Sequence, residues 1–509
     1  MPEHLRSLFI ILFLSTTVLV IARPFACNII SIGDFTRRRN LWFVITITAF
    51  LANSYWVYSL IAIALLRYSI RRETNQPALY FFILFALPAA TIVIPGIGPI
   101  NYFFELSQAR LLALFILLPA FFVLKRQSDS LSFGRTGPDK LLAMYLLLQI
   151  ITSFGGPSLT DVLRNIFYLF IDIFLPYFVV SRALKNLQDF RAALLSFVLA
   201  TMVLALLAVF EGFKSWLLYT SLLSSLGMPE GPRYLMRDGG LRAIVTAGNS
   251  IALGYLMVVG VGLFLFLQHS VPKNLYRWLG IGLLAAGMFA ALSRGPWVGA
   301  VVLLAVFVAT GRYASRRLVG LGVVAMLALS LLSVLPGGER IINLLPFIGT
   351  TEKGNVDYRE QLITNSIIVV QRNPWFGTYD YFTQPEMEAL RTGEGIIDVV
   401  NSYIGVVLEH GLVGLGLFVG FFVLTLLGIY RALRSIPDID NEERLLGRAL
   451  LATLVAIMVI IVTVSSITII PVVYWSVAGL GVAYTQMVRK NNIASEFSYS
   501  KRDGKVQPT

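Results

Sequence analysis

The sequence predicts an all-α polytopic membrane protein with about 12–14 transmembrane helices and a large external (periplasmic) loop late in the chain. Its 509 residues are 57% hydrophobic and only 14% charged, and the mean hydropathy is +0.76. A soluble fold cannot bury apolar runs that repeatedly approach ~20 residues, whereas such runs cross a bilayer as helices. The single cysteine, Cys27, excludes an internal disulfide and a thiolate metal cluster.

The apolar runs predict where the membrane helices lie. The first run, Ser7 to Ala22, resembles the apolar part of a signal peptide, but no small-residue cleavage site follows it, so we expect a retained span. The expected spans lie near 7–23, 42–66, 78–96, 110–124, 140–154, 163–181, 189–211, 249–268, 276–292, 296–310, 318–335, 412–430, 449–466 and 468–486. They divide the chain into N-terminal helices (1–139), core helices with the arginine motifs (140–335), a periplasmic loop subdomain (336–411), C-terminal helices (412–487) and a cytoplasmic tail (488–509).

Basic residues predict the orientation, because cytoplasmic loops are enriched in Lys and Arg. The formal charge of +13 comes mostly from such short loops, so it does not indicate a nucleic-acid surface. With the spans above, the basic loops share one side, so we expect both termini to be cytoplasmic. Arg37, Arg38 and Arg39 are the exception, since this topology places them outside. Either the segment 42–66 is a re-entrant hairpin broken at Asn53-Ser54, or the first span is misread.

Two external segments are long, about 212–247 and about 336–398. In the second, Tyr358 to Gln371 has the apolar spacing of a helix, which indicates an ordered subdomain rather than a flexible tether. Asn373 to Gly377 is typical of a turn with a buried aromatic side chain. Loops of this length in compact membrane proteins are usually functional.

Arg242 and Arg294 stand out because each lies in an otherwise apolar stretch at the same end of a predicted span. A permanent cation at a membrane boundary is costly unless it has a partner or a task. Arg242 could simply extend to the lipid headgroups, but Thr246, Gly248 and Asn249 follow it and suit a hydrated cavity. Together the two arginines indicate a site for a phosphate or pyrophosphate.

The segment Asn401 to Phe418 brings polar groups to the entrance of a glycine-spaced span. Glu409 and His410 could cap a helix end before Gly411, or one of them could act as a general base near the arginines. Arg359 lies on the external helix, and an arginine in such a position is usually a charge exposed to solvent.

Several signatures are missing from the sequence. It has no Walker A motif, no dinucleotide fingerprint, no Asp-x-Asp pair and no His/Glu zinc cluster. An enzyme that works outside the cytoplasm needs a donor that is already activated, and a lipid-linked pyrophosphate is one. We therefore expect no metal and no soluble cofactor.

At these residues the chain resembles the bacterial O-antigen ligase and O-antigen polymerase superfamily. The stretch Arg242 to Asn249 is similar to its R-x-x-x-T-x-x-N motif, and Ser293-Arg294-Gly295 to its S-R-G break. In the loop, Arg359 with Pro374-x-x-Gly377 matches an R…P-x-x-G stretch, and Asn401 to Gly411 matches H-N-x-Y…E-x-G. The resemblance covers about residues 140–486. It implies an integral-membrane glycosyltransferase that uses a glycan on undecaprenyl pyrophosphate.

One position departs from the family motif. The ligases have a His before the Asn, taken as the catalytic base, whereas this chain has Val400. Either Asp398, Glu409 or His410 substitutes for it, or no strong base is used. The departure favours a polymerase of exopolysaccharide or O-antigen repeat units over a ligase.

The resemblance also implies roles for the individual residues. Arg242 and Arg294 would hold the pyrophosphate and Glu409 and His410 would complete the catalytic set, with Glu409 favoured as an electrostatic group. The expected substrate-binding residues are Arg359, Asn249, Asn401 and Tyr403. The partners would be lipid-linked glycan donor and acceptor, membrane lipid and a chain-length regulator, with no nucleic acid.

Two alternatives remain. A ligase would attach finished glycan to a lipid or protein acceptor. A polysaccharide transporter or flippase would need charges along a central path, for which Asp172 and Glu211 are among the few candidates, and the sequence has no internal repeat.

Overall fold

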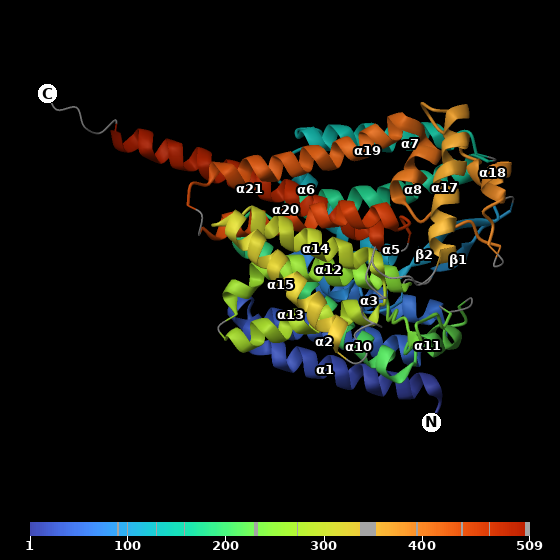
Figure 1. Ribbon diagram of the computed structural model, residues 1–509, viewed down its shortest axis with the longest axis horizontal. Coiled ribbons are helices and arrows are strands. Elements are labelled where there is room, and N and C mark those ends of the chain that lie inside the picture. The colour runs from blue at the N-terminus through green and yellow to red at the C-terminus, as the bar shows by residue number, and fades with distance from the viewer. Residues whose placement is uncertain are drawn as a thin grey trace.

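The computed structural model describes residues 1–88, 91–98, 100–128, 130–156, 158–228, 233–271, 273–335, 353–392, 395–438, 441–467 and 469–503 (Figure 1). It is an all-α bundle with two small β-hairpins. Within these described residues, eight helices are long and apolar enough to cross a membrane, and shorter apolar helices pack beside them. The chain is therefore a multi-pass membrane protein.

The elements follow one another with short links. The helices of the first half are α1 (Glu3–Ile29), α2 (Ile32–Leu51), α3 (Tyr55–Ile70), α4 (Gln76–Ile83), α5 (Gln108–Leu112), α6 (Leu118–Arg126), α7 (Gly137–Ser153), α8 (Leu159–Tyr168), α9 (Leu175–Ala183), α10 (Leu187–Lys214), α11 (Thr220–Ser225) and α12 (Ser250–Leu267). Those of the second half are α13 (Asn274–Ala290), α14 (Arg294–Ala309), α15 (Ala314–Val334), α17 (Lys353–Arg372), α18 (Pro385–Glu388), α19 (Ser402–Ser435), α20 (Glu442–Ile460) and α21 (Ile470–Asp503). The strands are β1 (Thr91–Pro95), β2 (Tyr102–Ser107), β3 (Met236–Arg237) and β4 (Gly240–Leu241); π- and 3-10-helical turns are η1 (Ala113–Leu117), η2 (Leu169–Phe174), η3 (Gln268–Ser270), η4 (Tyr381–Thr383) and η5 (Ile461–Thr463).

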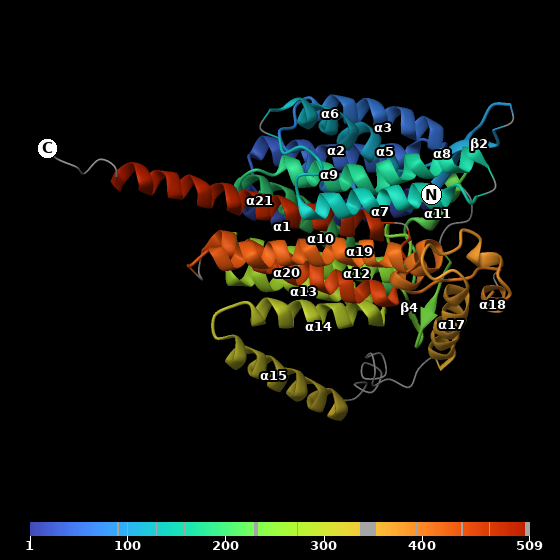
Figure 2. The same cartoon turned by 90° about the horizontal axis from the view of Figure 1, so that it is seen from above.

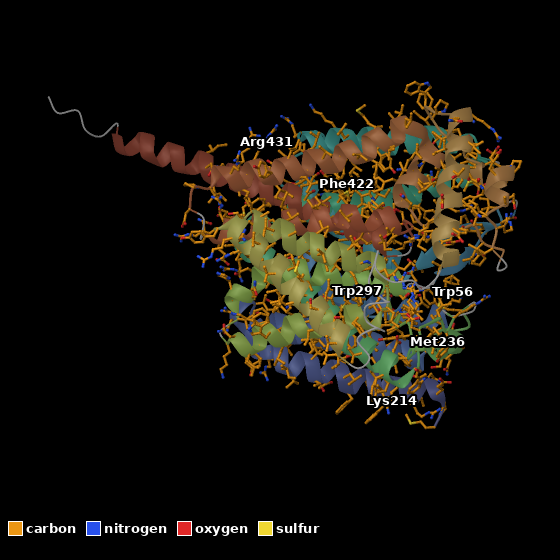
Figure 3. The ribbon with its side chains drawn as sticks, in the orientation of Figure 1. Trp56, Lys214, Met236, Trp297, Phe422 and Arg431 are labelled. Atoms are coloured by element: carbon orange, nitrogen blue, oxygen red, sulfur yellow. The ribbon has the colours of Figure 1, made fainter. Side chains whose placement is uncertain are left out.

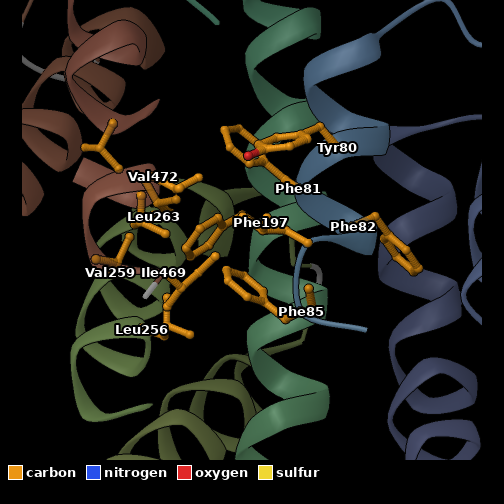
Figure 4. Packing of buried hydrophobic residues seen from close by; sticks show 14 of the residues in the cluster. Tyr80, Phe81, Phe82, Phe85, Phe197, Leu256, Val259, Leu263, Ile469 and Val472 are labelled. Carbon is orange, nitrogen blue, oxygen red and sulfur yellow. The ribbon is translucent and has the colours of Figure 1, made fainter. Parts of the chain in front are cut away.

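The core lies where α4, α10 and α12 meet near the start of α21 (Figure 4). Phe197 of α10 is buried between Phe81 and Phe85, with edge-to-face ring centroids 5.7 Å and 5.3 Å away. Both α10 and α12 are buried along most of their length, so they form the centre around which the other helices pack. Aromatic pairs of this geometry add to the packing energy beyond the area they bury.

The bundle has two ends with different chemistry. One end, called the basic end, holds the Arg- and Lys-rich links; there Gln188 at the start of α10 donates to the Ile29 carbonyl, and Arg191 pairs with Glu442. The other end, called the loop end, holds the described segments 215–228, 233–249, 353–392 and 395–401 and both hairpins (Figure 2). The labelled Trp56 and Met236 lie towards the loop end, and Arg431 lies towards the basic end (Figure 3).

The structure corrects the expectation that both termini share one side. Trp216, at the loop end, donates to the Glu3 carboxylate at 2.8 Å, so α1 starts at the loop end, whereas α21 finishes at the basic end (Figures 1 and 2). The reason is a missed break. The expected span 42–66 is two antiparallel helices, α2 and α3, joined at Ala52 to Ser54, where Asn53 has a φ of 49°. This is the hairpin alternative, and it changes the parity of the crossings.

The break also explains the exceptional arginines. Because α1 starts at the loop end, the turn after it brings Arg37 and Arg38 to the basic end with the other cationic links. There Arg38 is buried against the Glu73 carboxylate at 2.7 Å and donates to Ser196 at 3.2 Å. The arginines that contradicted the predicted topology therefore agree with the positive-inside pattern once the hairpin is recognised.

A second expected span, 78–96, is wrong in its later part. The helix α4 ends at Ile83, and β1 then pairs antiparallel with β2. The run Thr91 to Pro95 is apolar but β-branched, so it fits a strand as well as a span. The hairpin docks on α8, where the Tyr168 hydroxyl accepts from the Glu105 amide at 2.8 Å.

The loop segment after residue 352 is ordered around a small core of its own. The expected helix Tyr358 to Gln371 lies within α17. Its apolar face packs with α18 and the start of α19, around Leu362, Val369, Tyr381, Met387, Leu390, Ile397 and Leu408. The expected buried aromatic of the Asn373–Gly377 turn is wrong, because Trp375 and Phe376 are 63% and 59% exposed. Aromatic side chains at this level suit the boundary of a bilayer.

Candidate active site

The Arg242 segment is held in place by a buried carboxylate. Glu211, at the end of α10, accepts hydrogen bonds from the backbone amides of Leu218, Ile244 and Val245 at 2.9–3.0 Å. Val245 has a φ of 50°, so the chain turns sharply there. Three backbone bonds to one carboxylate fix the loop that carries Arg242, because each satisfies a buried donor that has no helical partner.

Arg294 reaches the same place from the other direction. It starts α14 after a three-residue link in which Leu292 has a φ of 46°. The amide of Ala243 donates to the carbonyl of Ala290 at 3.0 Å, which joins the Arg242 loop to the end of α13. Arg237 of β3 donates through Nη1 to the Leu292 carbonyl at 2.5 Å. The structure thus brings the two predicted segments together and adds Arg237 to them.

Arg359 of α17 approaches from the loop subdomain. Its Nη2 atom lies 3.5 Å from the carbonyl of Thr463, at the limit of a hydrogen bond. Thr463 also packs against Gly295, where a methyl group would collide with its hydroxyl, so Arg359 lies beside the start of α14. Partial removal from water lowers the pKa of Arg359; the charge of Arg237 acts in the same direction, and Asp398 opposes it. The guanidinium stays charged at neutral pH.

Asp398 is the acidic side chain beside these arginines. It is exposed, its Oδ1 atom accepts from the Ser465 hydroxyl at 2.7 Å, and its charge acts on Arg359. The Tyr358 hydroxyl holds the backbone of Asp398, since it donates to the carbonyl at 3.1 Å and accepts from the amide at 3.0 Å. We call Arg237, Arg242, Arg294, Arg359 and Asp398 the arginine cluster.

An apolar groove of about 440 Å³ begins beside the cluster and runs between α14, α19 and α20. At the end beside the cluster the groove is lined by Gly295 and Thr463, which contact each other at the start of α14. Its remaining lining is Val298, Tyr403, Leu426, Val455, Met458, Val459 and Val462. A cationic cluster above an apolar groove suits a ligand with an anionic head and a hydrocarbon tail.

Three of the predicted substrate-binding residues make bonds within the protein. Asn249 caps α12 by accepting from Ala252, and Asn401 caps α19 by accepting from Tyr403 and Ile404. The Tyr403 hydroxyl donates to the Met458 carbonyl of α20 at 2.9 Å. These bonds account for the residue types in the motifs, and substrate binding by the three remains a prediction.

Glu409 and His410 lie apart from the arginine cluster. The helix α19 packs between α7 and α20 (Figure 2), and both side chains line a pocket on its α7 side. His410 is buried, and its Nδ1 atom is 3.0 Å from the Thr152 hydroxyl of α7. Glu409 is about half exposed to the pocket, with its carboxylate 3.8 Å from His410 Nε2. The arrangement does not place them as bases beside Arg242 and Arg294.

Two family motifs lock together at this point. Gly411 interrupts α19 with a φ of 65°, and Gly377 has a φ of 69°. The Thr378 amide donates to the Leu408 carbonyl at 2.9 Å, and the Leu412 amide donates to the Pro374 carbonyl at 2.8 Å. A side chain at either glycine would collide with the opposite backbone. The P-x-x-G and E-x-G motifs therefore join the loop to α19.

Sequence reasoning missed three features of the site. Arg237 lies in a long mixed loop, and nothing in the sequence separates it from surface charges. Thr463 and Ser465 belong to a predicted span and its end. A signal did exist for Glu211, a lone acidic residue at the end of an apolar helix that leads into the Arg242 segment.

No curated protein matches the chain. A family model described as O-antigen ligase matches residues 279–419, which include Arg294, Arg359, Asn401 and Glu409. The matched residues 279–419 lie within the part of the chain that carries the motifs, so the match agrees with the resemblance to the O-antigen ligase and polymerase superfamily.

Proposed function

We propose that the protein is a membrane glycosyltransferase that polymerises oligosaccharide repeat units carried on undecaprenyl pyrophosphate. The family match gives the coarser statement, a membrane enzyme of the O-antigen ligase and polymerase type. The loop end would face the periplasm of a bacterial inner membrane, where such a donor needs no ATP.

One observation carries the proposal: the segments that hold Arg242 and Arg294 meet directly above an apolar groove. Guanidinium groups bind phosphate oxygens in a bidentate fork, and several together compensate the charges of a pyrophosphate. The groove beside Gly295 has the chemistry to take the first isoprene units of the lipid. A flippase would instead use a polar path through the bundle, and the buried Glu211 is saturated by backbone amides.

The reaction follows from this arrangement. The acceptor hydroxyl oxygen bonds to the anomeric carbon of the donor glycan, while the bond from that carbon to the pyrophosphate oxygen breaks. The hydroxyl proton passes to the Asp398 carboxylate, which later releases it to water. The leaving pyrophosphate gains negative charge, and the arginines stabilise this charge as it develops.

Position 400 supports a polymerase rather than a ligase that uses the family His. Val400 packs against the small core of the loop subdomain, together with Tyr358 and Ile404. Asp398, two residues earlier, accepts a hydrogen bond from the Ser465 hydroxyl, and its negative charge acts to raise the pKa of Arg359. Asp398 is the acidic member of the arginine cluster, and we assign it the proton-accepting role.

Reconstitution tests the proposal. Purified protein in liposomes receives lipid-linked repeat units isolated from a host strain that lacks the gene, and the products are separated on a gel. We expect a ladder of glycans, each one repeat unit longer than the last, and no ladder with Arg242→Ala. A single product formed only when lipid A-core is supplied would identify a ligase. Transfer of intact lipid-linked units across the bilayer without products would identify a flippase.

A further inference from the structure

A second pocket lies at the loop end, on the opposite side of α19 from the apolar groove. Its volume is about 250 Å³, and it lies between α7, α8, β2 and the turn after Gly377. Three of its lining residues are tyrosines, Tyr102, Tyr168 and Tyr379, and two are carboxylates, Asp161 and Glu409. The proposed transfer reaction uses none of them.

One buried donor points to a ligand. Gln149 of α7 lines the pocket and is only 9% exposed, and its Nε2 atom has no hydrogen-bond partner among the residues that the structure describes. A buried amide without a partner is costly, so an oxygen atom of a bound molecule or of water must complete it. The Glu409 carboxylate, about half exposed in the same pocket, offers the complementary acceptor.

An aromatic face lies across the mouth of the pocket. Tyr379 is 42% exposed, and its ring packs on Gly156, where a methyl group would lie 3.0 Å from the Tyr379 Cζ atom. The two consecutive glycines that link α7 to α8 thus leave room for this ring. Arg164 fixes the opposite wall, since it pairs with Asp161 and lies 3.6 Å from the centroid of Tyr102.

We infer that this pocket is a carbohydrate subsite that binds a sugar of the glycan several ångströms away from the reacting carbon. A sugar ring presents hydroxyl groups at its edge, which donate to a carboxylate and accept from an amide, and an apolar C–H face that packs on an aromatic ring. A phosphate is a poorer fit, because the Glu409 carboxylate would repel it and the lining cation, Arg164, is already paired with Asp161. The inference rests on the proposed function, since the glycan must continue from the arginine cluster.

The distance between the two sites suits a glycan of several sugars. Asn401 lies at the start of α19 beside the cluster, and Glu409 lies eight residues further along the same helix. At 1.5 Å per residue the separation is roughly 12 Å along the helix axis, and the glycan must also pass around α19, which is about 10 Å across. One oligosaccharide can therefore have its anomeric carbon at the arginines and a later sugar in the pocket.

Binding of a probe without lipid or phosphate tests the inference. Mild acid releases oligosaccharides from the surface polysaccharide of the host, and their dissociation constant for the full-length detergent-purified protein is measured by titration calorimetry. We expect Gln149→Leu and Tyr379→Ala each to weaken binding about three- to tenfold, the effect of one lost contact. Tyr379→Phe keeps the ring and should bind nearly as wild type. Phe382→Ala, an exposed aromatic outside the pocket, is the matched control.

Folding and function are separated by two further measurements. Gln149→Leu removes an uncompensated donor, so its thermal midpoint should equal or exceed that of wild type. Arg242→Ala should lose transfer and keep the oligosaccharide affinity. If wild type binds the probe through Gln149 and Tyr379 but transfers nothing, the proposed function fails and the subsite stands. Equal affinity of wild type, Gln149→Leu and Tyr379→Ala would overturn the subsite.

Discussion

The arginines at the two ends of the bundle are held by different partners. At the basic end, Arg38 and Arg182 are almost fully buried and each contacts a buried carboxylate, Glu73 at 2.7 Å and Asp139 at 2.6 Å. At the loop end, Arg359 approaches a backbone carbonyl, and the carboxylate that acts on it, Asp398, is exposed rather than buried. A carboxylate neutralises a guanidinium, whereas a carbonyl offers only a dipole. The comparison teaches that an arginine facing a buried carboxylate stabilises the fold at the basic end, whereas the role that we propose for the arginine cluster at the loop end is to bind an anion.

The contrast between the basic end and the loop end requires that they face opposite sides of the membrane, and cysteine labelling tests this. In a Cys27→Ser background, we expect Pro2→Cys, Leu235→Cys and Trp375→Cys to react with a membrane-impermeant thiol reagent in intact spheroplasts. Ser128→Cys and Asp438→Cys at the basic end should react only after lysis. Labelling of residues 2 and 128 from the same side would contradict the α2–α3 hairpin topology.

The next largest effect is on activity. Arg242→Ala and Arg294→Ala should each lower transfer by about 100-fold or more, because each charge-assisted bond contributes about 1.5–3 kcal/mol and more where charge develops. Lys at either position should restore activity only in part, since the bidentate fork is lost. The gel assay on proteoliposomes measures this. Arg391→Ala, an exposed loop-end arginine paired with Glu388, should polymerise normally. Polymer of normal length from both Arg242→Ala and Arg294→Ala would refute the pyrophosphate site.

At the basic end the effect should be on stability instead. Arg182→Met leaves the buried Asp139 without its cation and should lower the free energy of unfolding by about 3–5 kcal/mol. The double variant Arg182→Met/Asp139→Asn should recover much of it, because Asn keeps an acceptor for the Tyr177 hydroxyl and for the cap of α7. Thermal unfolding in detergent measures both. Transfer per folded molecule should stay at the wild-type level. A loss of transfer without a loss of stability would contradict a purely structural role for the pair at the basic end.

The smallest effect concerns the pocket beside α7. Glu409→Gln should raise the KM for the acceptor or donor glycan about three- to tenfold with a smaller change in kcat, as expected for a lost ground-state contact. His410→Gln should lower activity less than Glu409→Gln, because His410 is buried and bonds Thr152. Initial rates over a range of substrate concentrations decide this. A complete loss in His410→Gln, with a pH profile governed by one group near neutrality, would restore catalysis by His410.

The sequence predicted the helices well where an apolar run had polar ends. It failed at 42–66, because Asn53 is too small an interruption to show in an averaged hydropathy, although its left-handed backbone reverses the chain. It failed at Thr91 to Pro95, where apolar β-branched residues satisfy a strand and a span equally. Arg242 and Arg294 were recognisable in the sequence because each is an isolated charge in an apolar stretch, and their role in binding stays a prediction. Their meeting depends on Arg237 and Ala243, which contact residues about 50 positions away.

The pocket could not be predicted from sequence for a related reason. Gln149, Tyr379 and Glu409 come from three separate segments, and none is unusual in its own segment. The sequence placed Glu409 and His410 near the arginines because they share a motif with Asn401. However, Asn401 and Glu409 are eight residues apart on the helix. The packing of α7 against α19 determines which side of the helix Glu409 and His410 face.

The break at Gly411 makes Ser402 to His410 a short helix that sets the distance between two places in the molecule. Backbone hydrogen bonds and close contacts at Gly377 and Gly411 join this piece of α19 to the loop, and the break at Gly411 separates it from the part of the helix in the span. Its length sets the spacing between the arginine cluster and the tyrosine-lined pocket. Under the proposed function, a glycan bound at both places would be held in one register, so the same anomeric carbon would lie at the arginine cluster in every round of addition.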